Sequence, residues 1–165
     1  ILLPMSVVIS AVTNFLFALP MFVIVCLVSG HPLHSTLLLI PVALLIQGTF
    51  SVGLAFIFST VNVFYRDTQF ILDLVMLAWF FMTPIFYDIS QARPIMIGEQ
   101  IIDLALWVRR LNPMASMVNI FQELMYHGRI TALDFWLRTA ATSIVILIVG
   151  FLVFRRYSPR FGEEL

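Results

Sequence analysis

Apolar positions follow one another in four long runs along the chain, and a short polar or turn-forming segment separates each run from the next. A helix that crosses the hydrocarbon core of a bilayer needs about 20 predominantly apolar residues. The pattern therefore predicts four transmembrane helices, over residues 6–29, 35–65, 70–87 and 132–154. Pro20 and Pro41 predict kinks, because a proline frees a backbone carbonyl that neighbouring helices must satisfy.

The second run is longer than the bilayer core requires, which predicts tilt, a kink or an extension out of the membrane. Small side chains recur in it every four residues, at Ser51, Ala55 and Ser59. Positions four apart lie on one face of a helix, so this spacing predicts a face that another helix approaches closely.

Between the third and fourth runs the pattern changes without becoming that of a soluble protein. A narrow polar stripe on an otherwise apolar helix is formed by Glu99, Asp103 and Arg110. Asn112 and Pro113 then supply an N-cap residue followed by proline at the first helical position, which predicts a second helix that Gly128 ends. Helices of about three turns cannot cross a bilayer, so residues 99–127 predict a re-entrant or interfacial helical hairpin.

Composition supports an all-α membrane protein and excludes several functions. Hydrophobic residues make up 61% of the 165 residues and charged residues 11%, against about 45–50% and about 25% in soluble domains. All nine basic residues are arginine and the net charge is zero, so the chain has no basic surface for nucleic acid. Without lysine it has no P-loop, so we expect it to bind no cofactor, and any ATP and Mg²⁺ to be bound by a separate subunit.

No catalytic or metal-binding constellation is visible in the sequence. Cys26 lies within an apolar run, which favours a buried structural side chain. His31 and His34 form an H-x-x-H pair, but no third ligand or general base stands near them. His127 lies at a predicted helix end, where a capping role is expected. We therefore expect no metal site and no enzyme activity in this chain.

The arginines indicate an orientation in the membrane. Four spans would place four arginines on each side, at positions 66, 155, 156 and 160 on one side and 93, 109, 110 and 129 on the other. The raw count is therefore a tie. The tight cluster that directly follows the last span favours a cytoplasmic C-terminus.

Four short segments occur in a characteristic order along the chain, namely Asn62-Val63-Phe64-Tyr65-Arg66-Asp67, Thr83-Pro84-Ile85-Phe86-Tyr87, Leu111-Asn112-Pro113-Met114 and Phe161-Gly162-Glu163-Glu164-Leu165. Together with the apolar runs they resemble the permease subunit of ABC type-2 exporters, nearest to those that export O-antigen, capsular polysaccharide or teichoic acid. The resemblance covers essentially residues 1–165 and begins just before the third of six spans. It implies a partial permease domain in which the family's amphipathic N-terminal helix and first two spans are missing.

The resemblance also implies roles for particular residues near the third span. The turn with Arg66 and Asp67 would be cytoplasmic and contact the ATPase subunit, although any helical turn can use such a pair to stop and cap helices. The third span would line the translocation path. Aromatic faces stack on sugar rings, so the hypothesis is that a polymer slides past Trp79, Phe80, Phe86 and Tyr87. The alternative is an interfacial aromatic belt that faces lipid.

The predicted hairpin would face the exterior and close the path between two permease copies. Its candidate gate residues are Trp107, Asn112, Pro113, Phe121 and Tyr126. The family's working unit is two permeases with two ATPases, so the resemblance implies a homodimer in the bacterial inner membrane with an ABC ATPase as its partner.

The function implied by the resemblance is ATP-driven export of a cell-surface polysaccharide or lipid-linked glycan across the cytoplasmic membrane. The alternative is the same architecture exporting a drug, haem or another lipid. A membrane-embedded transferase would need clustered acids or histidines at one membrane face, and the carboxylates of this sequence are scattered.

Overall fold

Three long apolar helices dominate the structure, a computed structural model that describes residues 2–64, 68–85, 95–97, 100–102, 108 and 110–160. They are α1 (Leu2–Val28), α2 (Ile40–Phe64) and α6 (Leu133–Tyr157). A 3-10 turn, η1 (Ser35–Leu39), leads into α2, and together they make an apolar helix of 30 residues. Each of the three exceeds the length of about 20 residues that a membrane-spanning helix needs.

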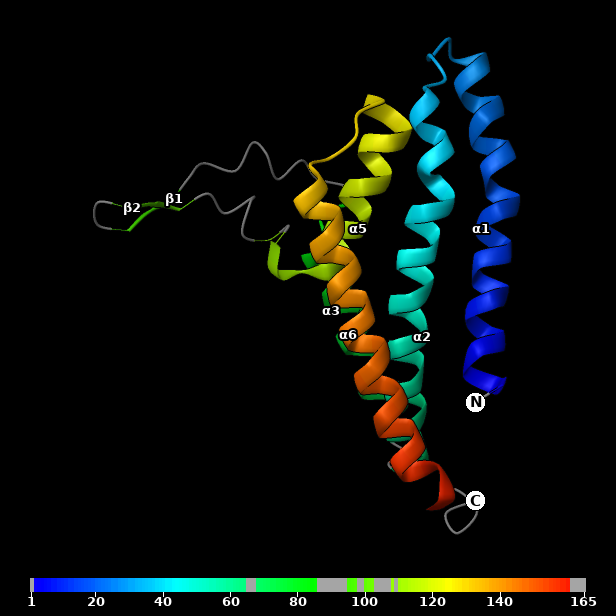
Figure 1. Cartoon of the computed structure of the whole chain (residues 1–165), viewed down its shortest axis with the longest axis vertical. Coiled ribbons are helices and arrows are strands. Elements are labelled where there is room, and N and C mark those ends of the chain that lie inside the picture. Colours follow the sequence, from blue (N-terminus) through cyan, green and yellow to red (C-terminus); the bar gives the residue numbers. More distant parts are fainter. Residues whose placement is uncertain are drawn as a thin grey trace.

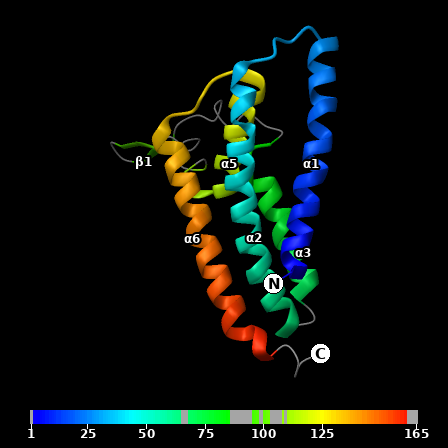
Figure 2. The ribbon, with the colours of Figure 1, turned by 45° about the vertical axis from the view of Figure 1, so that its right-hand side comes forward.

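The long helices lie side by side, with α2 between α1 and α6 (Figures 1 and 2). The ends of α2 and α6 meet at one end of the bundle, which we call the terminal end. There the rings of Phe64 and Tyr157 contact each other edge to face, with centroids 5.5 Å apart. The connections from α1 to α2 and into α6 lie at the opposite end, which we call the loop end.

Glycine allows α2 and α6 to approach closely. A Cβ atom on Gly53 of α2 would lie 2.7 Å from the backbone carbon of Ile146 and 2.7 Å from the backbone nitrogen of Leu147. A Cβ atom on Gly150 of α6 would overlap the carbonyl oxygen of Gly53. The closest contact between α2 and α6 is therefore made at glycine. The small side chains predicted to form a contact face on α2, Ser51, Ala55 and Ser59, are only half-buried.

Side chains around the glycine contact complete the interface between α2 and α6. The ring of Phe56 lies 5.1 Å from that of Phe154 and 6.1 Å from that of Phe151, measured between centroids. Ser143 is fully buried, and its hydroxyl donates a hydrogen bond to the carbonyl of Thr139 in its own helix at 2.9 Å. A buried hydroxyl satisfied in this way costs little in an apolar interior.

Helix α3 (Thr68–Met82) is shorter than the predicted span over residues 70–87. Its 15 residues extend about 22 Å, which is less than the hydrocarbon thickness. It ends before Pro84 because the proline lacks an N–H group and disfavours helical geometry in the preceding residue. Large apolar side chains are exposed along it, at Phe70, Ile71, Leu74, Leu77 and Phe81.

Helix α5 (Pro113–Gln122) is the second helix of the predicted hairpin. Its predicted start is confirmed, because the Asn112 side chain accepts hydrogen bonds from two backbone N–H groups in the first turn and proline follows at the first position. One wider helical turn, η3 (Glu123–His127), continues it. The predicted end is also confirmed: Gly128 terminates the turn with φ of 61°, in the left-handed region that favours glycine.

The prediction of a helix at the start of residues 99–127 is wrong. Strand β2 (Gln100–Ile102) pairs there with strand β1 (Ile95–Ile97) in antiparallel register, with Ile97 opposite Gln100. Isoleucine occupies four of the six strand positions, and a β-branched side chain favours extended backbone.

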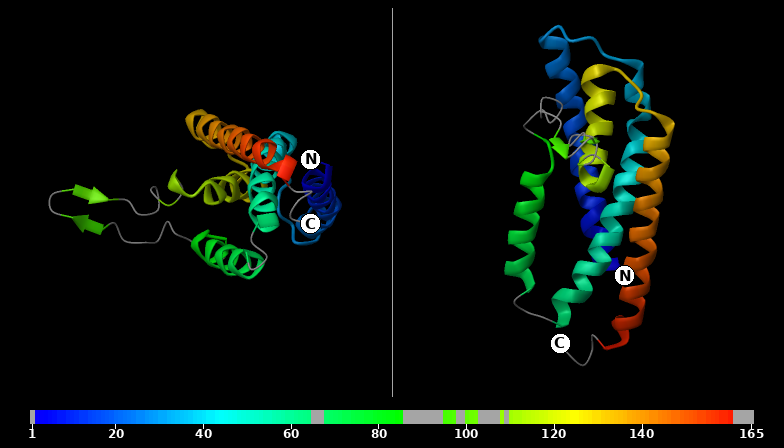
Figure 3. Two further views of the ribbon diagram at one scale, coloured as in Figure 1. Left: turned by 90° about the horizontal axis from the view of Figure 1, so that it is seen from below. Right: turned by 90° about the vertical axis from the view of Figure 1, so that its left-hand side faces the viewer.

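Helix α5 packs beside the half of α2 nearest the loop end (Figure 3). Ala43 of α2, Ile120 of α5 and Leu124 of η3 form a buried cluster. The hydroxyl of Thr36 in η1 donates a hydrogen bond to the carbonyl of Leu124 at 2.8 Å, which connects η1 to η3 directly. Apart from the short β-hairpin, the part of the chain that the structure describes is therefore that of an all-α membrane protein.

Candidate functional site

The side chain of Asn112 accepts hydrogen bonds from both α3 and α5. Its Oδ1 accepts one from the indole Nε1 of Trp79 at 2.9 Å. The same oxygen accepts from the backbone N–H groups of Met114 at 3.1 Å and Ala115 at 3.4 Å. One amide oxygen thus caps the start of α5 and binds the last turn of α3.

The amide nitrogen of Asn112 extends this contact to the residues that follow α3. Nδ2 donates to the hydroxyl of Thr83 at 3.2 Å and to the carbonyl of Met82 at 3.5 Å. The Thr83 hydroxyl in turn donates to the carbonyl of Trp79 at 2.9 Å. We call this cluster the Asn112 hub; it consists of Trp79, Met82, Thr83, Asn112, Met114 and Ala115. The sequence predicted the cap but not the contacts with α3.

The Asn112 hub lies at mid-depth of the bundle. The Trp79 ring contacts the ring of Phe50 edge to face, with centroids 6.1 Å apart. Phe50 is fully buried and stands at the middle of the 30-residue apolar helix Ser35–Phe64. If that helix crosses the membrane, water is absent at this level, and every N–H group left without an acceptor would carry a large free-energy cost.

The structure places two of the four predicted path residues. Trp79 is half-buried, and its N–H group already has an acceptor in the Asn112 hub. Phe80 is 41% exposed, and its ring contacts that of Phe81 edge to face at 5.6 Å. Of these two side chains, Phe80 is the more exposed. Phe86 and Tyr87 lie outside the residues that the structure describes.

Four of the five predicted gate residues are described, and they follow one helix. Asn112 and Pro113 begin α5, and Phe121 contacts the ring of Phe15 in α1, with centroids 5.5 Å apart. Tyr126 is 67% exposed, and its ring contacts that of Phe22 in α1 at 5.9 Å. Trp107 lies outside the described residues. The second helix of the predicted hairpin is therefore packed against α1 as well as α2.

The corner that follows α5 is closely packed. A Cβ atom on Gly128 would overlap the imidazole ring of His34. In the preceding turn, His127 Nδ1 lies 3.8 Å from the carboxylate Oε1 of Glu123. The loop end is therefore held together by contacts between the segment before α2 and the segment before α6.

Arg66 and Asp67, the predicted contacts with an ATPase, lie outside the described residues. The residues on either side of them are described: Phe64 ends α2, and Thr68 begins α3 with a buried side chain. The contact between Phe64 and Tyr157 places the end of α2 at the terminal end, beside the last turn of α6.

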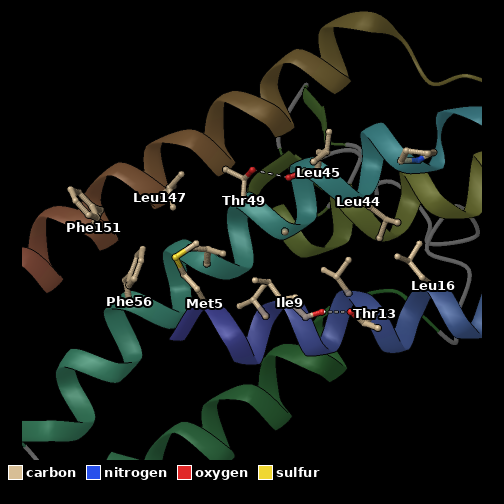
Figure 4. Close-up of a pocket in the computed structure, with 15 residues that line it drawn as sticks. Met5, Ile9, Thr13, Leu16, Leu44, Leu45, Thr49, Phe56, Leu147 and Phe151 are labelled. Carbon is tan, nitrogen blue, oxygen red and sulfur yellow. Dashed lines mark hydrogen bonds between the residues drawn. The ribbon is translucent and has the colours of Figure 1, made fainter. Parts of the chain in front are cut away.

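A cavity of about 750 Å³ lies between α1, α2 and α6 (Figure 4). Its lining is almost entirely apolar. The hydroxyls of Thr13 and Thr49 point along their own helices, where they donate to the carbonyls of Ile9 and Leu45 at 2.8 and 2.7 Å. A sugar needs hydrogen-bonding partners for its hydroxyls, so the chemistry of this cavity does not suit a glycan.

These features define a helical membrane protein with a polar hub at mid-depth. The O-antigen export system permease protein RfbA of Myxococcus xanthus is 31% identical over 168 residues, which cover 99% of this chain and 60% of that protein. Two permeases of the same name from Klebsiella pneumoniae are 30% and 29% identical over 164 residues, again with 99% and 60% covered. No family model and no solved structure matches the chain.

The resemblance to export permeases is therefore confirmed: the chain is related over nearly its full length to permeases of O-antigen export systems. It spans 60% of the length of the curated relatives that it matches.

Proposed function

We propose that this chain forms part of the membrane subunit of an ATP-driven ABC exporter that moves O-antigen, or a similar polysaccharide or lipid-linked glycan, across the bacterial cytoplasmic membrane. The observation that carries the proposal is the similarity of 99% of the chain to three O-antigen export permeases. The three long apolar helices support it, because a permease must cross the bilayer several times.

A separate ABC ATPase supplies the energy in this proposal. No lysine occurs in the 165 residues, so the chain offers no P-loop for ATP. Arg66 and Asp67 contact the ATPase from the turn at the terminal end. Arg155 and Arg156, both exposed in the last turn of α6, support a cytoplasmic position for that end.

Two copies of the permease form the path between them. The exposed apolar side chains of α3 support this, since they require either lipid or protein to cover them. Export proceeds past the aromatic residues Trp79, Phe80, Phe86 and Tyr87, and the 41% exposure of Phe80 leaves part of its side chain accessible to a sugar. Helix α5 contributes to the external gate.

The test is complementation in a strain that synthesises O-antigen but lacks its own permease gene. The full-length permease and its cognate ATPase are expressed together, and surface polymer is measured with an antibody while total polymer is measured after lysis. We expect surface polymer to appear only when both subunits are present and the ATPase retains its catalytic residues.

Two outcomes of this experiment would contradict glycan export. Polymer that remains inside the cell, despite normal amounts of both subunits in the membrane, would contradict glycan export. Resistance to a drug, or release of haem, without any surface polymer would instead support the same architecture with a different cargo.

A further inference from the structure

The Asn112 hub connects two helices to which the proposed function gives different tasks. Helix α3 lines the path, and α5 belongs to the gate. Three hydrogen bonds join the Asn112 side chain to α3 or the residue after it: Trp79 donates one, and Met82 and Thr83 each accept one. Since α3 exposes most of its apolar side chains, these bonds are a principal attachment of its end to the rest of the described bundle.

We propose that Asn112 is a positioning residue for transport, whose amide holds the end of α3 to the start of α5 so that the two helices move as one unit. The inference rests on the proposed function. It adds that a movement of the path-lining helix is transmitted to the gate through one side chain.

The chemistry of the amide explains why asparagine stands here. An N-cap requires only an acceptor, which serine or aspartate supplies about as well. The Asn112 hub requires an acceptor for Trp79 Nε1 and a donor for the Thr83 hydroxyl on the same side chain. Aspartate lacks the donor, and serine is too short to reach both groups. Capping and joining can therefore be separated by substitution.

The depth of the Asn112 hub explains why the joint persists while the helices move. In water, each of these hydrogen bonds would exchange readily with solvent. If the level of Phe50, the middle of a 30-residue apolar helix, lies within the membrane, few waters are at hand to replace a broken bond, so separation of α3 from α5 would leave polar groups without partners.

The first experiment uses the full-length permease with its ATPase in the complementation strain. Asn112→Ser keeps the cap and removes the joint, whereas Thr83→Val keeps the shape of the Thr83 side chain and removes the hydroxyl that accepts from Asn112. We expect each to lower surface polymer by about two- to tenfold at equal membrane protein level, as the loss of one or more hydrogen bonds implies. The ATPase activity of the purified complex in lipid should change by less than the export.

Asn119→Ser is the matched control, because Asn119 is half-buried in the same helix and its side chain has no hydrogen-bond partner among the described residues. We expect it to export normally. If Asn112→Ser fails to accumulate, Thr83→Val decides, since it removes one hydroxyl and leaves the cap of α5 unchanged. Normal export by Thr83→Val, or a fall in ATPase activity equal to the fall in export, overturns the proposal.

A second experiment replaces the hydrogen-bonded joint with a covalent one. The double variant Thr83→Cys/Asn112→Cys is made in a Cys26→Ala background, because the two native side chains touch and Cys26 is the one native cysteine in residues 1–165. We expect low export under reducing conditions and recovery when mild oxidation forms the disulfide, which peptide mass spectrometry verifies. Export in the reduced state that oxidation abolishes would show that the helices must separate, and would overturn the proposal.

The result for the unmodified permease distinguishes the two proposals. If it produces no surface polymer with its ATPase, the proposed function fails. If it exports normally and the variants do as well, the function stands and the role of Asn112 fails.

Discussion

The contact between α2 and α6 predicts a large effect from a single methyl group. Gly53→Ala would place a Cβ atom 2.7 Å from two backbone atoms of α6, where ordinary contacts begin at 3.4 Å, so the helices must separate by at least about 0.7 Å. These neighbours of the new Cβ are backbone atoms and cannot rotate away. Overpacking of this kind costs about 1–3 kcal/mol. Alanine also favours the helix by about 1 kcal/mol over glycine, and this gain is too small to offset the upper part of that range.

Gly48→Ala is the matched control, because Gly48 lies in the same helix and a Cβ atom there would meet nothing within 4 Å. We expect Gly48→Ala to leave the melting temperature of the detergent-purified permease unchanged or slightly raised. Gly53→Ala should lower it by up to about 8 °C, because a net cost of up to about 2 kcal/mol shifts Tm by about 2–4 °C per kcal/mol in a chain of this size. Equal melting temperatures for the two variants would show that α2 and α6 are not packed as described here.

Three further predictions concern the loop end and the path. Gly128→Ala should destabilise the protein more than Gly30→Ala in the same melting assay: both glycines have left-handed φ, 61° and 69°, but only at Gly128 does the new Cβ overlap His34. Thr36→Val should lower the free energy of unfolding by about 0.5–1.5 kcal/mol through loss of the bond to Leu124, and Thr49→Val, which loses a bond within its own helix, should cost less. Phe80→Ala should lower surface polymer at equal protein level while Phe81→Ala does not, and unchanged export in both would remove the stacking hypothesis.

Local signals in the sequence predicted those elements that depend on neighbouring residues. Uniformly apolar runs identified α1, α2 and α6 to within a few residues at most ends, because length and composition suffice for such helices. Asn112 and Pro113 fixed the start of α5, and Gly128 fixed the end of η3, through backbone chemistry that operates over one turn.

The errors and omissions arose where distant or competing effects decide. A charged stripe at helical spacing suggested a helix beginning near Glu99, whereas the isoleucines of β1 and β2 favour extended backbone. In the Asn112 hub, Trp79 and Asn112 are hydrogen-bonded although they are 33 positions apart in the sequence. No helical or strand periodicity connects positions that far apart. Likewise, the sequence showed the small-residue stripe on α2, but it did not show that α6 contacts the face that carries Gly53.

Because Thr83 and Asn112 touch, the chain leaves α3 and returns to α5 at nearly the same point. A loop whose two ends are pinned together is tolerant of insertions, since doubling its length costs only about 0.6 kcal/mol in closure entropy. During evolution, the intervening segment can therefore grow, shrink or be exchanged without refitting the bundle. Grafting this segment between homologues therefore offers a route to chimaeras that retain the remaining helices.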